Sequence, residues 1–195
     1  MGFRSCPVKF TTGHGSVAEE VGCMKQLVIR MLLDRGVEME DIAQLVFALQ
    51  HPYHPSLKLK QCLVSVGSVL EKREVQYAML TGIVLDTYAE NGLLPEPLQT
   101  AIFTDEPLFG IDEVLALAIT NVYGTIGLTN FGYLDKTKMG ILAVLNDHPH
   151  AVHTFLDDLV AGLAAAASAR IAHNGFADEE EAHGPIAATH EPVLL

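Results

Sequence analysis

The sequence has few cysteines and no closely spaced pair of them, which excludes two common kinds of site. The three cysteines are Cys6, Cys23 and Cys62, and no Cys-x-x-Cys motif occurs. Zinc ribbons and thioredoxin-type redox chemistry are therefore excluded. Widely spaced cysteines in odd number fit a reducing compartment, so we expect a cytoplasmic protein.

Long apolar runs are also lacking. No stretch reaches the roughly 18 consecutive apolar residues that a membrane-spanning helix needs. The nearest approach, from Leu159 to Ala167, is expected to lie in the protein core. The N-terminal stretch MGFRSCPVKF has no apolar run after its charges and does not match a secretory signal. The sequence thus predicts a chain without a transmembrane segment.

Positive charge is scarce. The chain has 12 lysines and arginines against 24 aspartates and glutamates, which gives a formal net charge of −12. An acidic protein repels nucleic acid, and its overall field gives it no attraction to anionic lipid. We therefore expect no nucleic-acid partner. An anionic substrate would need a metal ion or a few local cations.

Strand patterns and the motifs of covalent catalysis are missing as well. No segment shows the strict alternation of a half-buried strand, so the sequence predicts an all-α fold. No Gly-Lys-Ser/Thr phosphate loop, Asp-x-Asp-x-Thr motif or Gly-x-Ser-x-Gly elbow occurs. A covalent reaction mechanism therefore has no support in the sequence.

Apolar residues at helical spacing are present along most of the chain. They predict a compact multi-helix single domain over residues 17–173, with an N-terminal arm (1–16) and an acidic, flexible tail (174–195). Residues 123–140, which contain several glycines, are expected to form a loop. The expected helices cover residues 16–35, 38–50, 57–71, 71–89, 95–103, 112–124, 141–146 and 154–173.

Two adjacent aspartates, Asp157 and Asp158, begin a segment that is otherwise almost entirely Ala, Gly, Leu and Val. Thr154 and Asp157 match the spacing of a capping box, which gives Asp157 a purely structural interpretation. Asp158 lies about 100° further round the helix and has apolar neighbours, so capping does not explain it. Small residues after the pair would let other helices approach closely.

Further acids occupy comparable positions. Asp112 and Glu113 begin another apolar helix, although Asp112 also suits an ordinary N-cap. Asp86 lies in the apolar stretch TGIVLDTYAE and is expected near the edge of the core. Carboxylates that converge from several helices hold hard cations such as Mg²⁺. A metal ion held in this way can activate water and neutralise phosphate charge.

Two segments offer groups for an anion. In the glycine-containing segment, Thr129, Asn130 and Lys136 could bind phosphate oxygens, although an ordinary connector explains the glycines equally well. Near residue 71, Glu71 and Glu74 share one helical face and could bind Mg²⁺, or could form a solvated surface. Arg73, between them, could face an anion.

The chain contains the blocks EKREVQYAMLTGIVLDTYAE, EPLQTAI, FGIDEVLALAITNVYGTIGLTNFGYLDK and HTFLDDLVAGLAAAASAR. Together these blocks closely resemble the soluble branch of the phosphatidylglycerophosphatase A family. The resemblance implies an all-helical fold and a Mg²⁺-dependent phosphomonoesterase that converts phosphatidylglycerol phosphate to phosphatidylglycerol and phosphate. It also implies peripheral contact with the inner face of the cell membrane.

These observations lead to one hypothesis for the site and two alternatives. The expected catalytic residues are Asp157, Asp158 and Asp112. The expected metal ligands are these three with Glu113 and Asp86, and the expected substrate-binding residues are Thr129, Asn130, Lys136 and Arg73. The alternatives are an all-α nucleotide pyrophosphohydrolase and a non-catalytic oligomeric helical protein. A homo-oligomer is expected because the small-residue helix could pack against a partner chain.

Overall fold

The computed structural model describes residues 17–147 and 151–174. The expected N-terminal arm and all but the first residue of the expected acidic tail lie outside the described residues. Within the described residues the chain forms nine α helices and one 3₁₀ helix, with no strand, which confirms the all-α prediction. The helices are α1 (Val17–Asp34), α2 (Met39–Gln50), α3 (Leu59–Val69), α4 (Arg73–Glu90), α5 (Leu98–Phe103), α6 (Ile111–Thr120), η1 (Asn121–Tyr123), α7 (Thr125–Thr137), α8 (Ile141–Asn146) and α9 (Leu156–Asn174).

The segment expected to be a loop at 123–140 is mostly helix, so that prediction is wrong. Its glycines do not prevent helix formation, because tertiary packing outweighs their low helix propensity. Phe131 and Leu134 are buried one turn apart, and α7 packs along α9. At Gly127 the absence of a side chain lets α7 approach the end of α6, where an added Cβ would lie 3.0 Å from the Thr120 carbonyl oxygen.

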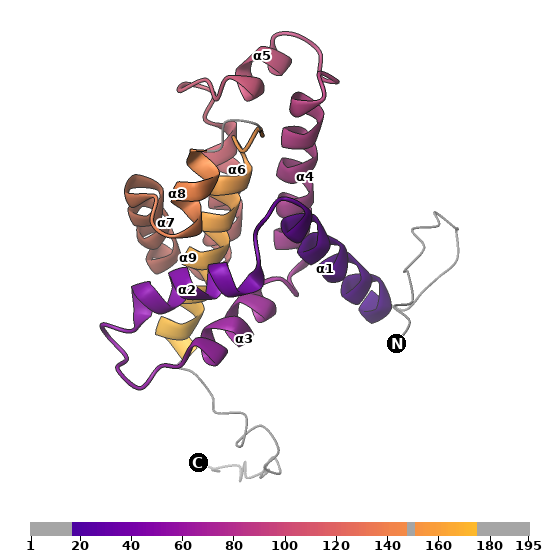
Figure 1. Cartoon of the computed structure of the whole chain (residues 1–195). Helices are drawn as coiled ribbons and strands as arrows, with labels where there is room; N and C mark the ends of the chain where they lie inside the picture. Colours follow the sequence, from indigo (N-terminus) through magenta and orange to yellow (C-terminus); the bar gives the residue numbers. More distant parts are fainter. Residues whose placement is uncertain (1–16, 148–150, 175–195) are drawn as a thin grey trace, which may run out of the picture.

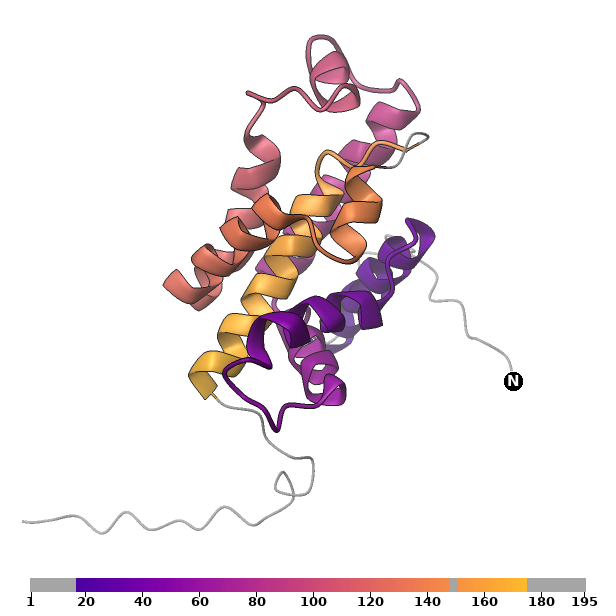
Figure 2. The ribbon, with the colours of Figure 1, turned by 60° about the vertical axis from the view of Figure 1, so that its left-hand side comes forward.

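Helix α9 is the centre of the fold. It is apolar on every side, and a helix of that kind belongs in a core. The described side chains from Leu156 to Ala169 are all buried. Figures 1 and 2 show α9 running through the middle of the molecule, where it contacts α2, α3, α4, α6, α7 and α8.

Glycines set how closely two helices approach α9. An alanine Cβ at Gly162 of α9 would lie 3.0 Å from the carbonyl oxygen of Ala116 in α6. On α4, a Cβ at Gly82 would lie 2.9 Å from Phe155 Cβ, just before α9 begins. The contact at Gly82 is too short for a side chain, and at Gly162 a side chain would fit only if its neighbour shifted, so these glycines let α4 and α6 lie close against α9.

No helix in the described part of the chain is both long enough and apolar enough to cross a lipid bilayer.

Candidate functional site

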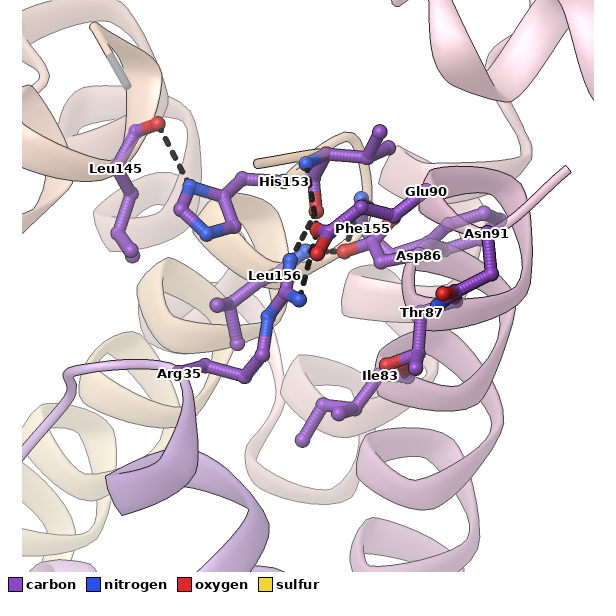
Figure 3. Close-up of polar contacts among 11 residues, drawn as sticks. Arg35, Ile83, Asp86, Thr87, Glu90, Asn91, Leu145, His153, Phe155 and Leu156 are labelled. Carbon is purple, nitrogen blue, oxygen red and sulfur yellow. Dashed lines mark hydrogen bonds and ion pairs between the residues drawn. The ribbon is translucent and has the colours of Figure 1, made fainter. Parts of the chain in front are cut away.

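The start of α9 is held by a carboxylate from α4. Asp86 is fully buried, and its two oxygens accept hydrogen bonds from the backbone N–H groups of Phe155 (3.0 and 3.2 Å) and Leu156 (2.9 Å). Figure 3 shows the Asp86 side chain directed at this turn. Gly82 lies one helical turn before Asp86 and leaves the space that brings α9 within reach. Asp86 therefore caps a helix that is distant in sequence.

A second set of contacts fixes the segment before α9. The Arg35 guanidinium pairs with Glu90 at 2.9 Å and also donates to the Val152 carbonyl oxygen (Figure 3). Glu90 in turn accepts the backbone N–H of Val152 at 3.1 Å. The Thr154 hydroxyl donates to the Ile102 carbonyl oxygen at 2.6 Å. These bonds tie α1, α4 and α5 to the chain that leads into α9.

The capping box expected from the sequence does not form. Thr154 uses its hydroxyl on Ile102, and Asp86 supplies the cap instead. Asp157 accepts the neighbouring N–H of Asp158 at 2.9 Å through one oxygen. Its other oxygen is directed to a lysine of the α7–α8 connection. The structural interpretation of Asp157 as a capping-box residue is therefore wrong.

A pocket of about 260 Å³ lies at this end of the molecule. It is formed by the segment before α6, the end of α7, the end of α8 and the first turn of α9. Among the residues described, seven carboxylates and one ammonium group line it. Its lining residues are Asp105, Glu106, Pro107, Gly110, Asp112, Glu113, Asp135, Lys138, Asn146, Thr154, Asp157 and Asp158.

The two aspartates of α9 are the most deeply placed acids of this acidic pocket. Asp157 is 8% exposed and Asp158 is 4% exposed. Burial raises the pKa of Asp158 to about 8, and the adjacent charge of Asp157 adds to the rise. Burial also raises the pKa of Asp157, against the opposing effect of the Lys138 charge. At both carboxylates the effect of burial on the pKa thus outweighs the opposing effect of the Lys138 charge.

Lys138 supplies the positive charge at the base of the pocket. It ends α7 in the left-handed conformation (φ 42°), which turns the chain toward α9. Its Nζ lies 2.7 Å from Asp135 Oδ1, 2.8 Å from Asp157 Oδ2 and 3.5 Å from Asp158 Oδ1. Burial would lower the pKa of Lys138, but the charges of Asp157 and its neighbours raise it overall, so the ammonium form persists.

The donor set suits a hard divalent cation, because such ions prefer carboxylate oxygens. One oxygen of Asp112, Oδ1, is buried with no hydrogen-bond partner in the described structure. An orphaned carboxylate oxygen is expensive to bury, and a cation would satisfy it. As they stand, however, no three acidic, histidine or cysteine side chains of the described ranges are grouped closely enough to hold a metal ion. The acids fit a metal only after local rearrangement.

A second hollow of about 180 Å³ adjoins the acidic pocket. The two share Asp105, Asn146, Thr154 and Asp157 as lining residues. The second hollow has fewer acidic residues than the first, and its further lining residues are Phe103, Thr104, Leu145, Ala151, Val152 and His153. It therefore provides room beside the acids for an uncharged part of a ligand.

The structure brings together four of the residues singled out from the sequence: Asp112 and Glu113 from α6, and Asp157 and Asp158 from α9. Asp86 is not among them. Both of its oxygens are occupied by the backbone of α9, so its expected role as a metal ligand is replaced by that of a cap.

None of the four predicted substrate-binding residues lines the acidic pocket. Thr129 donates its hydroxyl to carbonyl oxygens of its own helix, at 3.2 Å from both Thr125 and Ile126. Lys136 and Arg73 are exposed, and Asn130 is half-buried on α7. Thr129, Asn130 and Lys136 were chosen for an expected loop that is in fact helix α7, whereas Arg73 begins α4.

Sequence reasoning missed Lys138 and Asp105, the latter in a left-handed conformation with φ 51°. Burial raises the pKa of Asp105, with further contributions from the charges of Asp157 and Asp112. A local signal existed for Lys138: it stands two residues before Gly140, at a position suited to a helix end. No comparable signal marked Asp105.

Comparison with known proteins identifies a family. The model of the family described as "Phosphatidylglycerophosphatase A" matches residues 28–173. Two curated proteins of Bacillus subtilis (strain 168) are similar. "Uncharacterized protein YpjQ" is 58% identical over 77% of this chain and 86% of its own length. "Uncharacterized protein YutG" is 54% identical over 80% of this chain and 94% of its own length.

Solved structures are similar to this chain over most of its length. The low temperature requirement C protein from Listeria monocytogenes is 58% identical, with a TM-score of 0.75 over 77% of this chain and 95% of that one. A protein of unknown function from Bacillus stearothermophilus is 56% identical, with a TM-score of 0.75 over 76% of this chain and 93% of that one. The chain belongs to the phosphatidylglycerophosphatase A family.

Proposed function

We propose that this protein is a Mg²⁺-dependent phosphomonoesterase whose substrate is phosphatidylglycerol phosphate. The observation that carries the proposal is the acidic pocket, in which Asp157 and Asp158 of α9 face Asp112 of α6. Membership of the phosphatidylglycerophosphatase A family supports a phosphatase activity. The seven carboxylates of the pocket repel an anionic phosphate, and a bound cation would offset this repulsion.

In this proposal Asp112, Asp157 and Asp158 hold the ion, and Glu113 contributes from the first turn of α6. When bound, Mg²⁺ supplies positive charge that stabilises the phosphoryl transition state and makes water more acidic. One pocket carboxylate accepts the proton of the attacking water. The water oxygen bonds to phosphorus, the phosphorus–oxygen bond to the glycerol breaks, and the alcohol oxygen takes up a proton.

The apolar surroundings of the pocket support a lipid substrate. Leu108 is 92% exposed, although its neighbours Glu106, Pro107 and Gly110 line the acidic pocket. Phe103 and Ile111, on either side of this segment, are also exposed. Exposed apolar side chains beside a polar site are typical of contact with a partner or a membrane. We therefore place the protein in the cytoplasm, in peripheral contact with the inner membrane face.

A homo-oligomer forms part of the proposal. Tyr77, Val84 and Tyr88 are exposed along one side of α4, and a stripe of this kind favours association. Light scattering coupled to gel filtration measures the mass directly. A monomer at all concentrations would remove this part of the proposal and leave the activity untouched.

The decisive experiment measures phosphate release from phosphatidylglycerol phosphate in detergent micelles. We expect release with Mg²⁺ and none with EDTA. Asp158→Asn should lower the rate by roughly 100-fold or more, because it removes a carboxylate from the reacting centre. The matched control is Asp34→Asn, which makes the same charge change at an exposed position on α1. Release that is insensitive to EDTA or to Asp158→Asn would refute the proposal.

The same assay separates the alternatives. A pyrophosphohydrolase would release pyrophosphate from nucleoside triphosphates and leave the lipid phosphate intact. The acids that favoured it, Glu71 and Glu74, are exposed outside the pocket, and Glu71 pairs with Lys25 at 3.2 Å. A non-catalytic protein would turn over neither substrate and would show no response to Mg²⁺.

A further inference from the structure

We infer that the Lys138 ammonium occupies the cation position of the acidic pocket, and that Mg²⁺ binds by displacing it. The inference rests on the proposed function, because it concerns the same ion. In the metal-free protein Lys138 therefore competes with Mg²⁺ for the same carboxylates. We call it a positioning residue.

The geometry around Lys138 is that of a bound cation. Its Nζ lies within 3.5 Å of oxygens from Asp135, Asp157 and Asp158, which come from two different helices. It is the single positive group among the described residues that line the pocket. An ammonium ion and a hydrated divalent ion compete for the same negative field, so both cannot hold this position at full strength.

Displacement also explains two observations that otherwise stand apart. The pocket is rich in carboxylates, yet no three of them in the described ranges are close enough together to hold a metal ion. Meanwhile Asp112 Oδ1 is buried without a partner, while Lys138 is engaged by Asp135, Asp157 and Asp158. A divalent ion at the centre would draw Asp112 toward Asp157 and Asp158 and take the place of the ammonium group.

The displaced side chain remains near the pocket. Lys138 is anchored by its backbone at the end of α7, where its N–H bonds to the Leu134 carbonyl oxygen at 2.8 Å. Its four-carbon stem allows the ammonium group to swing while the helix end stays fixed. Once released, the ammonium group would remain at the pocket, where it could contact phosphate oxygens. The phosphate contact that the sequence indicated for Lys136 would then belong to Lys138.

The test is Mg²⁺ binding to metal-free protein, measured by calorimetry at about pH 9 so that protons compete little for the carboxylates. Lys138→Met keeps an unbranched side chain only one atom shorter than lysine but removes the competing charge. We expect it to lower the Kd for Mg²⁺ by roughly tenfold. Lys136→Met is the matched control, because Lys136 is exposed outside the pocket, and its Kd should stay within about twofold of wild type.

Each outcome has a meaning. An unchanged or raised Kd in Lys138→Met overturns the inference, since Lys138 would then only organise the acids, and the proposed function would survive. An equal gain in both variants also overturns it, because a general charge effect would explain the result. If Mg²⁺ binds neither wild type nor Lys138→Met, the inference and the proposed function fail together.

A measurement on the wild-type protein removes any dependence on how the variant folds. Acylation of lysine amines, read residue by residue by mass spectrometry, reports how accessible Lys138 is. We expect Mg²⁺ to speed the acylation of Lys138 several-fold as its ion pairs break, while Lys136 serves as the internal reference. A Lys138 rate that is unchanged or slower with saturating Mg²⁺ contradicts displacement.

Discussion

Replacing Gly82 with alanine has two opposite effects on the free energy of unfolding. Alanine is favoured over glycine in a helix by about 1 kcal/mol. At Gly82, however, the added Cβ would lie 2.9 Å from Phe155 Cβ and also meet the Leu159 side chain. Both neighbours are fully buried, and Phe155 Cβ cannot swing away because it is bonded directly to the backbone.

The expected result follows from the two magnitudes. Overpacking a core typically costs about 1–3 kcal/mol, and the rigid contact places Gly82→Ala at the upper end. After the helix-propensity gain is subtracted, the free energy of unfolding should fall by about 2 kcal/mol. For a domain of this size the midpoint of thermal unfolding should drop by about 4–8 °C.

Gly132→Ala is the matched control. Gly132 is exposed on α7, and a Cβ there would have no atom within 4 Å. Only the propensity term remains, so the free energy of unfolding should rise by up to about 1 kcal/mol. Urea unfolding followed by far-ultraviolet circular dichroism measures both changes. If both variants are stabilised alike, the close approach of α4 to α9 is refuted.

Gly82 also has a bearing on the site. The close contact that it permits lets Asp86 reach the backbone of Phe155 and Leu156. If α4 and α9 separate in Gly82→Ala, the first turn of α9 loses its cap, and Asp157 and Asp158 move with it. We therefore expect a weaker thermal response to Mg²⁺ in Gly82→Ala than in Gly132→Ala.

Two further predictions concern buried acids of the metal-free protein. Burial raises the pKa of Asp86 from its usual 3.8 to about 8, so the folded state retains a proton that the unfolded chain has released. The free energy of unfolding should therefore decrease as the pH rises from 5 to 8. Urea titrations at several pH values should show a smaller decrease in Asp86→Asn than in wild type. An equal decrease in the two proteins contradicts this. Asp112→Asn removes a negative charge and replaces the carboxylate, whose Oδ1 has no hydrogen-bond partner in the described structure, with a neutral amide. It should raise the free energy of unfolding of metal-free protein by about 1 kcal/mol and reduce the thermal shift with Mg²⁺; a less stable variant with an intact shift would argue against Asp112 as a ligand.

Much of the helical fold could be predicted because apolar spacing reports which face of a helix is buried. Helix α7 was the exception, since its glycines lower helix propensity and its packing on α9 depends on tertiary structure. Gly127 lies within the helix, where its missing side chain allows a close contact with Thr120. A pattern within one segment cannot distinguish these two uses of glycine.

The candidate site was only partly predictable for a similar reason. Asp157 and Asp158 stood out because acids among apolar neighbours need a partner. Asp86 showed the same signal, yet its partner is a backbone 69 residues away, and nothing local indicates where α4 meets α9. Lys138 was passed over for Lys136 because the choice depends on where α7 ends and turns.

The central claim is that carboxylates of α6 and α9 share one divalent ion. The most direct test is a crystal of the full chain soaked with Mn²⁺, with the ion located by its anomalous scattering. The account predicts a peak in the acidic pocket, bound by Asp112, Asp157 and Asp158, with Lys138 moved away from Asp157. A pocket that still holds Lys138 against Asp157 at saturating Mn²⁺, without a peak, would contradict it.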